Sequence, residues 1–179
     1  MPQVSWSEVK LYRKCPKAHD YKYREKLKKK KKSVPLLKGS ILHDMLNALV
    51  MHKKFKNYDG PDPWDVLDKY EDEYAKLFAE EQEEYGDVID HCTRIFEGYM
   101  HKYKNDELKY EYTEEFVATD LTDEIRFIGY IDKIARDDNN RRWLMDHKFV
   151  KNIPSDSDRF FEVQQPLFYI WAWDRWQPD

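Results

Sequence analysis

The amino-acid sequence predicts a mixed α/β (α+β) fold, in which a helical N-terminal half precedes an antiparallel three-stranded β-meander and a closing helix. Three successive hydrophobic patterns predict this order. Apolar residues recur mainly with helical spacing over residues 1–105, alternate with polar residues over residues 106–150, and return to helical spacing over residues 157–177. Because 179 residues suffice for one domain with a sizeable core but not comfortably for two, we expect a single domain over residues 1–179.

Composition and charge limit the function. Hydrophobic residues make up 41% of the chain and aromatic residues 16%, which supports a packed core. The 35 acidic side chains outnumber the 31 Lys and Arg, and the net charge of −4 argues against a protein that coats nucleic acid with a uniformly basic surface. No segment resembles a signal peptide or a membrane span, so we expect a cytoplasmic protein without a membrane partner. Two Cys are too few for a disulfide framework or a Cys-only metal site.

The first helix has a recognisable start and end. Ser5 is followed three residues later by Glu8, which is a capping-box arrangement, and Pro16 ends or interrupts the helix. The basic segment at residues 24–39 is broken by a Pro and a Gly, so we expect a loop there; the breaking residues are Pro35 and Gly39.

Three amphipathic helices are expected next. Over residues 40–55 the apolar side chains fall at helical spacing, at Ile41, Leu42, Met45, Leu46, Leu49 and Val50. A turn at residues 58–63 leads to a second long helix over residues 64–85 with an acidic outer side. Gly86 separates this helix from a third over residues 87–105.

The alternating segment predicts strands. Tyr, Phe, Val, Ile and Trp recur over residues 108–121, 124–137 and 141–150, and the turn-like sequences TD and DDNN join these runs. We therefore expect three consecutive strands that form the meander. The helical spacing of residues 157–177 then predicts the closing helix.

The stretch GYIDKIARDDNNRRWLMDHKFV, residues 129–150, places charged side chains where strands normally carry buried aliphatic ones. Residues two apart on a strand face the same side, so Asp146 and Lys148 are expected to point together while His147 faces away. Asp132 is expected across from them, because the DDNN turn pairs the two strands. Adjacent carboxylates need a cation between them, and oxygen ligands favour Mg²⁺ or Mn²⁺. The amine would act on a water nucleophile or a developing negative charge.

A solvated sheet face is the alternative interpretation of the same residues. Asp and Lys at alternate strand positions are common on exposed sheets, and D-x-K occurs by chance in many chains of this size. The choice between the two interpretations depends on what else the sequence contains.

Four sequence elements occur in a fixed order over nearly the whole chain. They are SWSEVKLYRKCP, GSILH, GYID with DHK, and QPLFY. Together they resemble the RecB-like nucleases of the PD-(D/E)XK superfamily, a group that includes CRISPR-associated RecB-like exonucleases and many phage exonucleases. The matched family features are a Ser-rich helix ending in Tyr-x-x-Cys-Pro, a Gly four residues before a helical His, the pair G-x-x-D and D-x-K, and a Gln four residues before a Tyr.

The resemblance implies a restriction-endonuclease-like core and a metal-dependent nuclease, with exonuclease action favoured over endonuclease action. The metal ligands that it implies are His43, Asp132, Asp146 and the backbone carbonyl of His147. It implies Lys148 as the catalytic Lys beside the two Asp, and Gln165 and Tyr169 as residues that orient the site or contact DNA. Without the family pattern, His43 reads equally well as a core histidine of an amphipathic helix.

The chain departs from the family in three places. Iron–sulfur members use one Cys in the first helix and three after the nuclease core; Cys15 matches the first, but no Cys follows Cys92, so we expect no iron–sulfur cluster. Ile131 replaces the Pro that names the superfamily. Family domains usually continue into further strands, whereas ten residues follow Tyr169, so we expect a sheet that is small, truncated, or completed by a second copy or another partner.

Five consecutive Lys, Lys28, Lys29, Lys30, Lys31 and Lys32, have two interpretations. They bind DNA phosphates without sequence specificity, or they form a solvated loop. The functional prediction is hydrolysis of phosphodiester bonds in single- or double-stranded DNA. The alternative is a non-catalytic DNA-binding or assembly module that keeps the nuclease fold. Whether the setting is phage replication or host recombination and repair stays open.

Overall fold

The chain folds into two compact units, each assembled from segments that are distant in the sequence. The computed structural model describes residues 1–150 and 156–176. We call residues 1–31, 114–131 and 152–179 the terminal unit, and residues 32–113 and 132–151 the central unit. Each is described by itself below.

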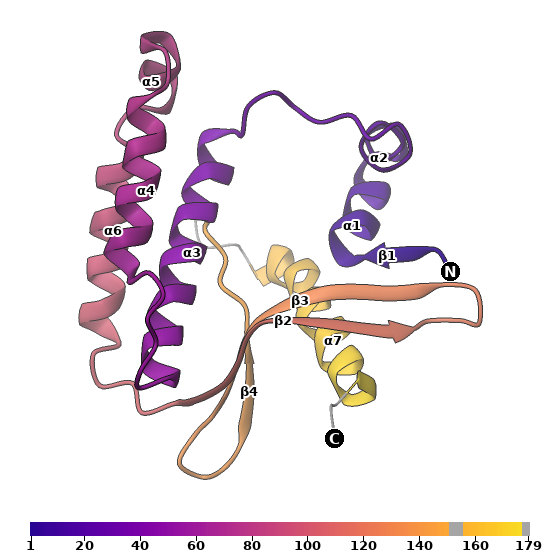
Figure 1. The fold of residues 1–179 in the computed structure, drawn as a ribbon. Helices are drawn as coiled ribbons and strands as arrows, with labels where there is room; N and C mark the ends of the chain where they lie inside the picture. Colours follow the sequence, from indigo (N-terminus) through magenta and orange to yellow (C-terminus); the bar gives the residue numbers. More distant parts are fainter. Residues whose placement is uncertain (151–155, 177–179) are drawn as a thin grey trace. The chain divides into compact units, whose positions relative to one another are not determined.

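The helices of the central unit are α3 (Val34–Lys54), α4 (Pro63–Ala75), α5 (Ala79–Tyr85) and α6 (Val88–Lys102) (Figure 1). Helix α3 packs against both α4 and α6. The buried core between these helices consists of Ile41, Leu42, Met45, Leu46, Leu67, Tyr85, Val88, Cys92 and Phe96. The predicted amphipathic stripe of residues 40–55 therefore forms one wall of this core.

Helix α3 begins earlier than its sequence predicts. The expected loop over residues 24–39 ends at Ser33, because Pro35 occupies the first helical turn, where its missing N–H costs nothing. Gly39 lies inside the helix, with room for a further carbon: a Cβ built there would lie 4.0 Å from the Cβ of Phe149. The prediction that both residues break the chain was wrong.

The long helix expected over residues 64–85 is two helices. The side-chain amide of Gln82 donates to the carbonyl oxygens of Tyr74, Ala75 and Leu77, at 3.3, 3.4 and 3.2 Å. These contacts satisfy backbone acceptors at the end of α4, so the helix ends without a Gly or Pro. The Asp62 side chain caps the start of α4 through the backbone N–H groups of Trp64 and Asp65.

The terminal unit contains α1 (Trp6–Lys14), α2 (Pro16–His19), a π-helical turn η1 (Asp20–Arg24) and α7 (Asp156–Trp176). Half of the capping box predicted for α1 forms: the Ser5 hydroxyl accepts the backbone N–H of Glu8 at 3.3 Å, whereas the Glu8 carboxylate pairs with His19 at 3.0 Å. The predicted closing helix is confirmed as α7. Aromatic rings join these elements: Phe168 of α7 lies 4.9 Å from Trp6 and 5.6 Å from Phe127, between ring centroids.

The strands form one mixed open sheet. They are β1 (Gln3–Ser5), β2 (Lys109–Asp120), β3 (Arg126–Arg136) and β4 (Arg142–Met145), and β3 pairs with each of the other three. The consecutive strands β2, β3 and β4 are those of the predicted meander. Strand β1 is an addition that the sequence did not predict; it pairs in parallel with β3, with Val4 opposite Phe127.

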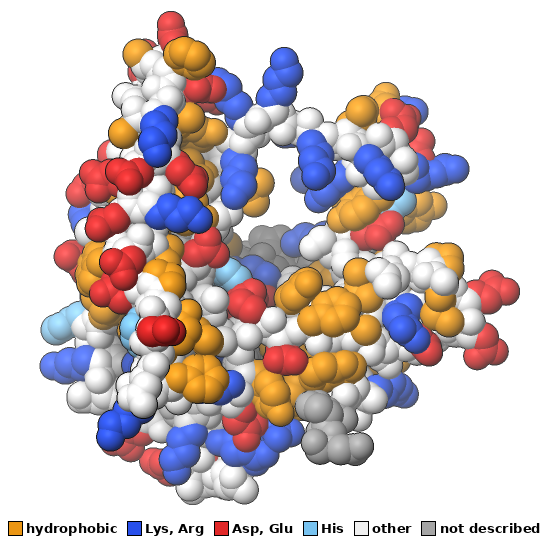
Figure 2. All heavy atoms as spheres, in the orientation of Figure 1, with side chains coloured by type: hydrophobic (Ala, Val, Ile, Leu, Met, Phe, Trp, Pro, Cys, Tyr) orange, Lys and Arg blue, Asp and Glu red, His pale blue; other side chains and the backbone are white. Residues whose placement is uncertain are grey.

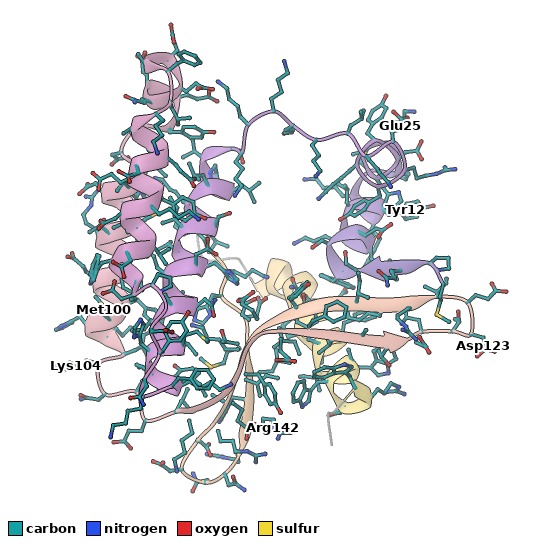
Figure 3. The ribbon with its side chains drawn as sticks, in the orientation of Figure 1. Tyr12, Glu25, Met100, Lys104, Asp123 and Arg142 are labelled. Carbon is teal, nitrogen blue, oxygen red and sulfur yellow. The ribbon has the colours of Figure 1, made fainter. Side chains whose placement is uncertain are left out.

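Strand β4 is shorter than expected, since it ends at Met145 and residues 146–150 have no regular structure. Among the helices that the structure describes, none has the length and apolar character needed to span a bilayer. Arg142, at the start of β4, lies on the β3–β4 hairpin (Figure 3).

Candidate active site

Pairing of β3 with β4 in the central unit places the two predicted carboxylates next to each other. Lys133 of β3 lies opposite Met145 of β4 in an antiparallel register. Asp132 directly precedes Lys133, and Asp146 directly follows Met145. Both Asp therefore lie just beyond the same end of the β3–β4 ladder. The sequence expectation that Asp132 lies across from the D-x-K segment is met.

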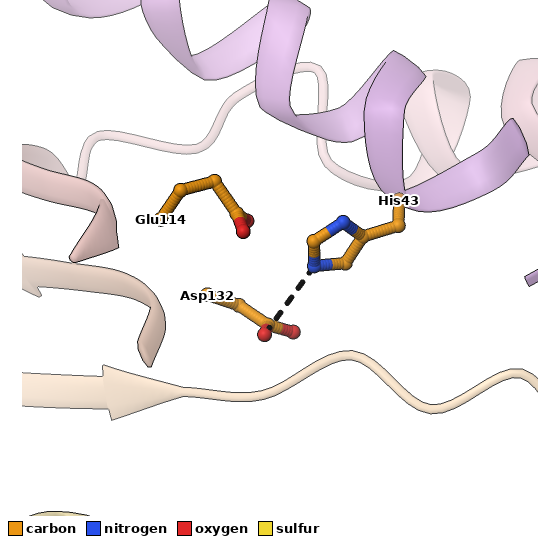
Figure 4. A group of neighbouring side chains, drawn as sticks. All are labelled: His43, Glu114 and Asp132. Atoms are coloured by element: carbon orange, nitrogen blue, oxygen red, sulfur yellow. Dashed lines mark ion pairs between the residues drawn. The ribbon is translucent and has the colours of Figure 1, made fainter. Parts of the chain in front are cut away.

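Asp132 is held by two donors. One carboxylate oxygen, Oδ1, lies 3.3 Å from Nε2 of His43, which projects from α3, and this ion pair is drawn in Figure 4. The other oxygen accepts the backbone N–H of His147 at 2.8 Å. Burial alone would raise the pKa of Asp132, but these two hydrogen bonds outweigh it, so the pKa lies below its ordinary value. The carboxylate is therefore an anion at neutral pH.

Asp146 has the opposite balance. Its Oδ1 accepts the ammonium of Lys148 at 2.8 Å, although the segment is not a strand. The side chain of Asp146 is 9% exposed, and burial raises its pKa more than the Lys148 charge lowers it, while the nearby charge of Asp132 raises it further. Two adjacent carboxylates whose pKa values move in opposite directions are typical of a functional site.

The ring of His147 faces into the central unit. Its Nε2 lies 3.5 Å from the hydroxyl of Tyr99, and its buried Nδ1 has no hydrogen-bond partner among the described residues. Burial, and then the charge of Lys133, lower the pKa of His147 to about 4, so the imidazole is neutral at pH 7. The predicted alternation of His147 with Asp146 and Lys148 assumed a strand, whereas residues 146–150 are not a strand, and His147 and Lys148 line the same pocket.

The residues predicted at the closing helix lie in the terminal unit. The Gln165 amide donates to the Tyr169 hydroxyl at 3.0 Å, whereas the neighbouring Gln164 accepts from Arg13 of α1 at 2.9 Å. Tyr169 packs directly on Gly129, since a Cβ at Gly129 would lie 2.7 Å from Cε1 of the ring. The Gly of GYID thus makes room for the Tyr of QPLFY.

The Lys cluster is divided between the two units. Lys28 to Lys31 are exposed and belong to the terminal unit. Lys32 begins the central unit: its ammonium donates to the Ser40 hydroxyl at 3.2 Å, and its carbonyl accepts the Tyr85 hydroxyl at 3.1 Å.

The sequence analysis did not single out Glu114, the third side chain drawn in Figure 4. Glu114 directly follows Thr113, whose hydroxyl donates to the Asn47 side chain at 2.6 Å, and it stands where β2 passes from the central to the terminal unit. Its φ of 51° is unusual for a strand residue other than Gly.

A signal for Glu114 was present in the sequence. Two adjacent Glu, residues 114 and 115, point to opposite faces of a regular strand, because neighbouring side chains alternate. Where one face of the strand packs against a core, one of the two carboxylates points inward.

Comparison with known protein families agrees with the fold. The family model of the PD-(D/E)XK nuclease superfamily matches residues 3–178. The chain therefore belongs to the PD-(D/E)XK nuclease superfamily. These proteins are metal-dependent nucleases, so nucleic acid is the class of substrate and a divalent metal ion the class of cofactor. A search of curated proteins gives no match.

Proposed function

We propose that this protein is a Mg²⁺- or Mn²⁺-dependent deoxyribonuclease of the RecB-like branch and that it acts as an exonuclease. The observation that carries the proposal is the arrangement in the central unit, where His43 and Asp132 form one pair and Asp146 and Lys148 form another at the end of the same strand pair. Because the superfamily match spans residues 3–178, we further propose that both units form one nuclease domain.

The donor set fits a hard divalent cation. Asp132 is anionic, and carboxylate and backbone carbonyl oxygens are the ligands that Mg²⁺ and Mn²⁺ prefer. We assign His43, Asp132, Asp146 and the backbone carbonyl of His147 as ligands. When bound, the cation would supply positive charge to the phosphate and lower the pKa of water.

The side chains contribute separate steps. Lys148 is 45% exposed and carries the positive charge nearest to Asp146, so it can hold a phosphate oxygen or move a proton at the attacking water. The backbone N–H of His147 fixes the orientation of Asp132. We assign Gln165 and Tyr169 to positioning of the site or of DNA, through the hydrogen bond that joins them.

Charge supports DNA as the substrate. Residues 1–31 contain eleven Lys or Arg against three Asp or Glu, a net charge of +8, and all eleven basic side chains are exposed. Figure 2 shows basic side chains around α1, α2 and the segment that follows them. We propose that Lys28 to Lys32 bind the phosphate backbone as part of this basic segment.

The test is incubation of the protein with end-labelled linear and circular DNA, single- and double-stranded, with Mn²⁺, with Mg²⁺ or with EDTA. We expect metal-dependent release of short products from linear DNA, and circles that resist cleavage. Cleavage of circles would replace exonuclease with endonuclease action. DNA binding without any metal-dependent product would instead identify a non-catalytic module.

A further inference from the structure

We propose that a pocket beside the candidate active site binds one unpaired nucleobase, so that the enzyme acts on single-stranded or frayed DNA. The inference rests on the proposed nuclease function and names its substrate class. The pocket has a volume of about 680 Å³ and lies entirely within the central unit. Its lining includes His43, His147 and Lys148, so it opens directly onto the residues assigned to the reaction.

The walls of the pocket are apolar and aromatic. Leu42 and Leu46 of α3 and the fully buried Phe96 of α6 lie on its inner side, and Tyr99 and Phe149 also line it. Two large aliphatic side chains of the lining stay open to solvent, since Leu36 is 59% and Ile95 37% exposed. A charged phosphate has no favourable contact with such walls, whereas the flat, largely apolar face of a base does.

The charges of the pocket suit the rest of a nucleotide. Lys32 and Lys148 are part of the lining, and both carry an ammonium that can contact a phosphate on either side of a bound base. The pocket is thus apolar where a base would lie and cationic where the backbone would pass. A volume of this size is in the ordinary range for a small-molecule site and does not accommodate a stacked duplex.

A base must leave its stack to enter. In a duplex the two faces of each base contact its neighbours and its edge is paired, so entry would require unstacking and unpairing, which a single strand does not. Gly39 contributes to this space, because it is the lining residue of α3 without a side chain. The geometry therefore favours single-stranded ends over intact duplex.

The experiment fills the pocket from its edge. Ile95→Trp adds an indole at a partly exposed position of α6, where the fold should tolerate it. The matched control is Thr93→Trp, which adds the same side chain on another face of α6, in a groove with Leu67 and Ile89. Leu36→Trp is a second filling variant from α3. Circular dichroism and melting temperature establish that each variant is folded.

Binding is measured in EDTA by fluorescence anisotropy. The probes are a labelled oligothymidylate, a series of the same strand in which each member has a single abasic position at a different place, and a duplex of equal length. We expect one abasic position to weaken binding of the parent protein about tenfold, in line with the loss of one stacked base. Ile95→Trp should weaken single-strand binding by a similar factor, and the abasic position should then cause no further loss. Thr93→Trp should bind like the parent protein.

Each outcome separates the pocket from the nuclease function. If no abasic position changes affinity, or if the losses from Ile95→Trp and the abasic position multiply, the pocket does not hold a base. Cleavage of intact duplex at the single-strand rate would also overturn the proposal while leaving the nuclease in place. Base-dependent binding without cleavage in Mn²⁺ would keep the pocket and overturn the proposed function.

Discussion

Lys148 and Asp146 share a hydrogen bond of 2.8 Å, yet they should affect different measurements. A protonated amine has no lone pair for a metal, so the contribution of Lys148 should fall on the reaction and not on assembly of the site. Asp146 supplies an anionic oxygen, so its removal should affect both.

The first prediction concerns Lys148. Lys148→Ala should retain Mn²⁺ and DNA binding while losing cleavage about a hundredfold or more, the usual contribution of a general acid–base group. Lys148→Arg should rescue poorly, because a guanidinium has a different shape and stays protonated. Calorimetry for Mn²⁺ and single-turnover cleavage on the same preparations check this. Parental cleavage by Lys148→Ala would make Lys148 a solvated surface residue.

The second prediction concerns the metal ligands. Asp132→Ala should abolish cleavage and weaken Mn²⁺ binding, because it removes an anionic oxygen and the contact with His43. His43→Ala should be milder with Mn²⁺, because the carboxylates remain. Calorimetric titration with Mn²⁺ is the measurement. Unchanged metal affinity in Asp132→Ala and Asp146→Ala together would place the ligands elsewhere.

At this scale the sequence predicted much of the candidate site. The positions of Asp132, Asp146 and Lys148 follow from strand order and from a spacing of two, which survived although residues 146–150 are not a strand. Glu114 escaped because its backbone conformation does not follow the alternation on which strand arguments depend. The orphaned nitrogen of His147 depends on burial, which only the packed fold reveals.

At the scale of elements, Gly129 is a point of close packing between strand β3 and helix α7 within the terminal unit. The Tyr169 ring of α7 lies against β3 where Gly129 has no Cβ. The third prediction is that Gly129→Ala lowers the free energy of unfolding by about 1–3 kcal/mol, the usual cost of overpacking a buried contact. Urea denaturation measures it, and the added methyl should also displace the Tyr169 hydroxyl from Gln165.

The control is another glycine. A Cβ at Gly98 in α6 would have no atom within 4 Å, so Gly98→Ala should stabilise the protein by about 0.5–1 kcal/mol through helix propensity. In a double-mutant cycle, Tyr169→Ala should remove most of the cost of Gly129→Ala. Additive losses would show that the Tyr169 ring is not what Gly129 accommodates.

The fourth prediction concerns an ion network in the central unit. Glu111 of β2 accepts from Arg136 at 2.5 Å and from Arg142 at 2.9 Å. Partial burial would raise the pKa of Glu111, but these two hydrogen bonds lower it below its ordinary value. A lowered pKa gives stability that is present above the unfolded pKa, about 4.3, and is lost as the pH falls through the folded value.

The matching variant is Glu111→Gln. It should lower the free energy of unfolding by about 1 kcal/mol at pH 7, and the difference should close below about pH 4. Urea denaturation at a series of pH values checks this, and 1 M salt should narrow the difference at pH 7. A gap that persists at pH 3 would assign the effect to packing and not to charge.

The sequence located the elements better than it located their ends. Periodicity identified α3, α6, α7 and the three strands of the meander. Pro35 and Gly39 were read as breaks because their usual effect was assumed, whereas Pro35 occupies a first turn and Gly39 lies beside Phe149. The break between α4 and α5 depends on hydrogen bonds from the Gln82 side chain to earlier backbone carbonyls. Such hydrogen bonds do not change the spacing of apolar residues, so the hydrophobic pattern does not reveal the break.

At the scale of the whole molecule, two parts of the sequence carry opposite net charges. Residues 1–31 carry +8, while the remaining 148 residues carry 20 basic and 32 acidic side chains, a net charge of −12. The value of −4 for the chain, which argued against a basic surface, is the sum of two opposite contributions.

The fifth prediction follows from this division. Changing Lys28 to Lys31 to Gln should weaken DNA binding in EDTA and flatten its dependence on salt, because fewer counterions are released. The control changes four exposed lysines of the central unit to Gln, namely Lys69, Lys76, Lys102 and Lys104, which alters net charge equally. Mn²⁺ affinity should not change in either. Equal salt slopes in the two variants would identify residues 28–31 as a solvated loop.

The parallel pairing of β1 with β3 has a consequence for biosynthesis. Gln3 finds its partner at Arg126, 123 residues later in the chain. At a translation rate of about 5–20 residues per second, β1 waits roughly 6–25 s before that partner has been made. During this interval Trp6 lacks Phe168, which is made later still. Residues 3–6 therefore lack these partners until most of the 179 residues have been made, and chaperone binding in that interval would protect their apolar side chains.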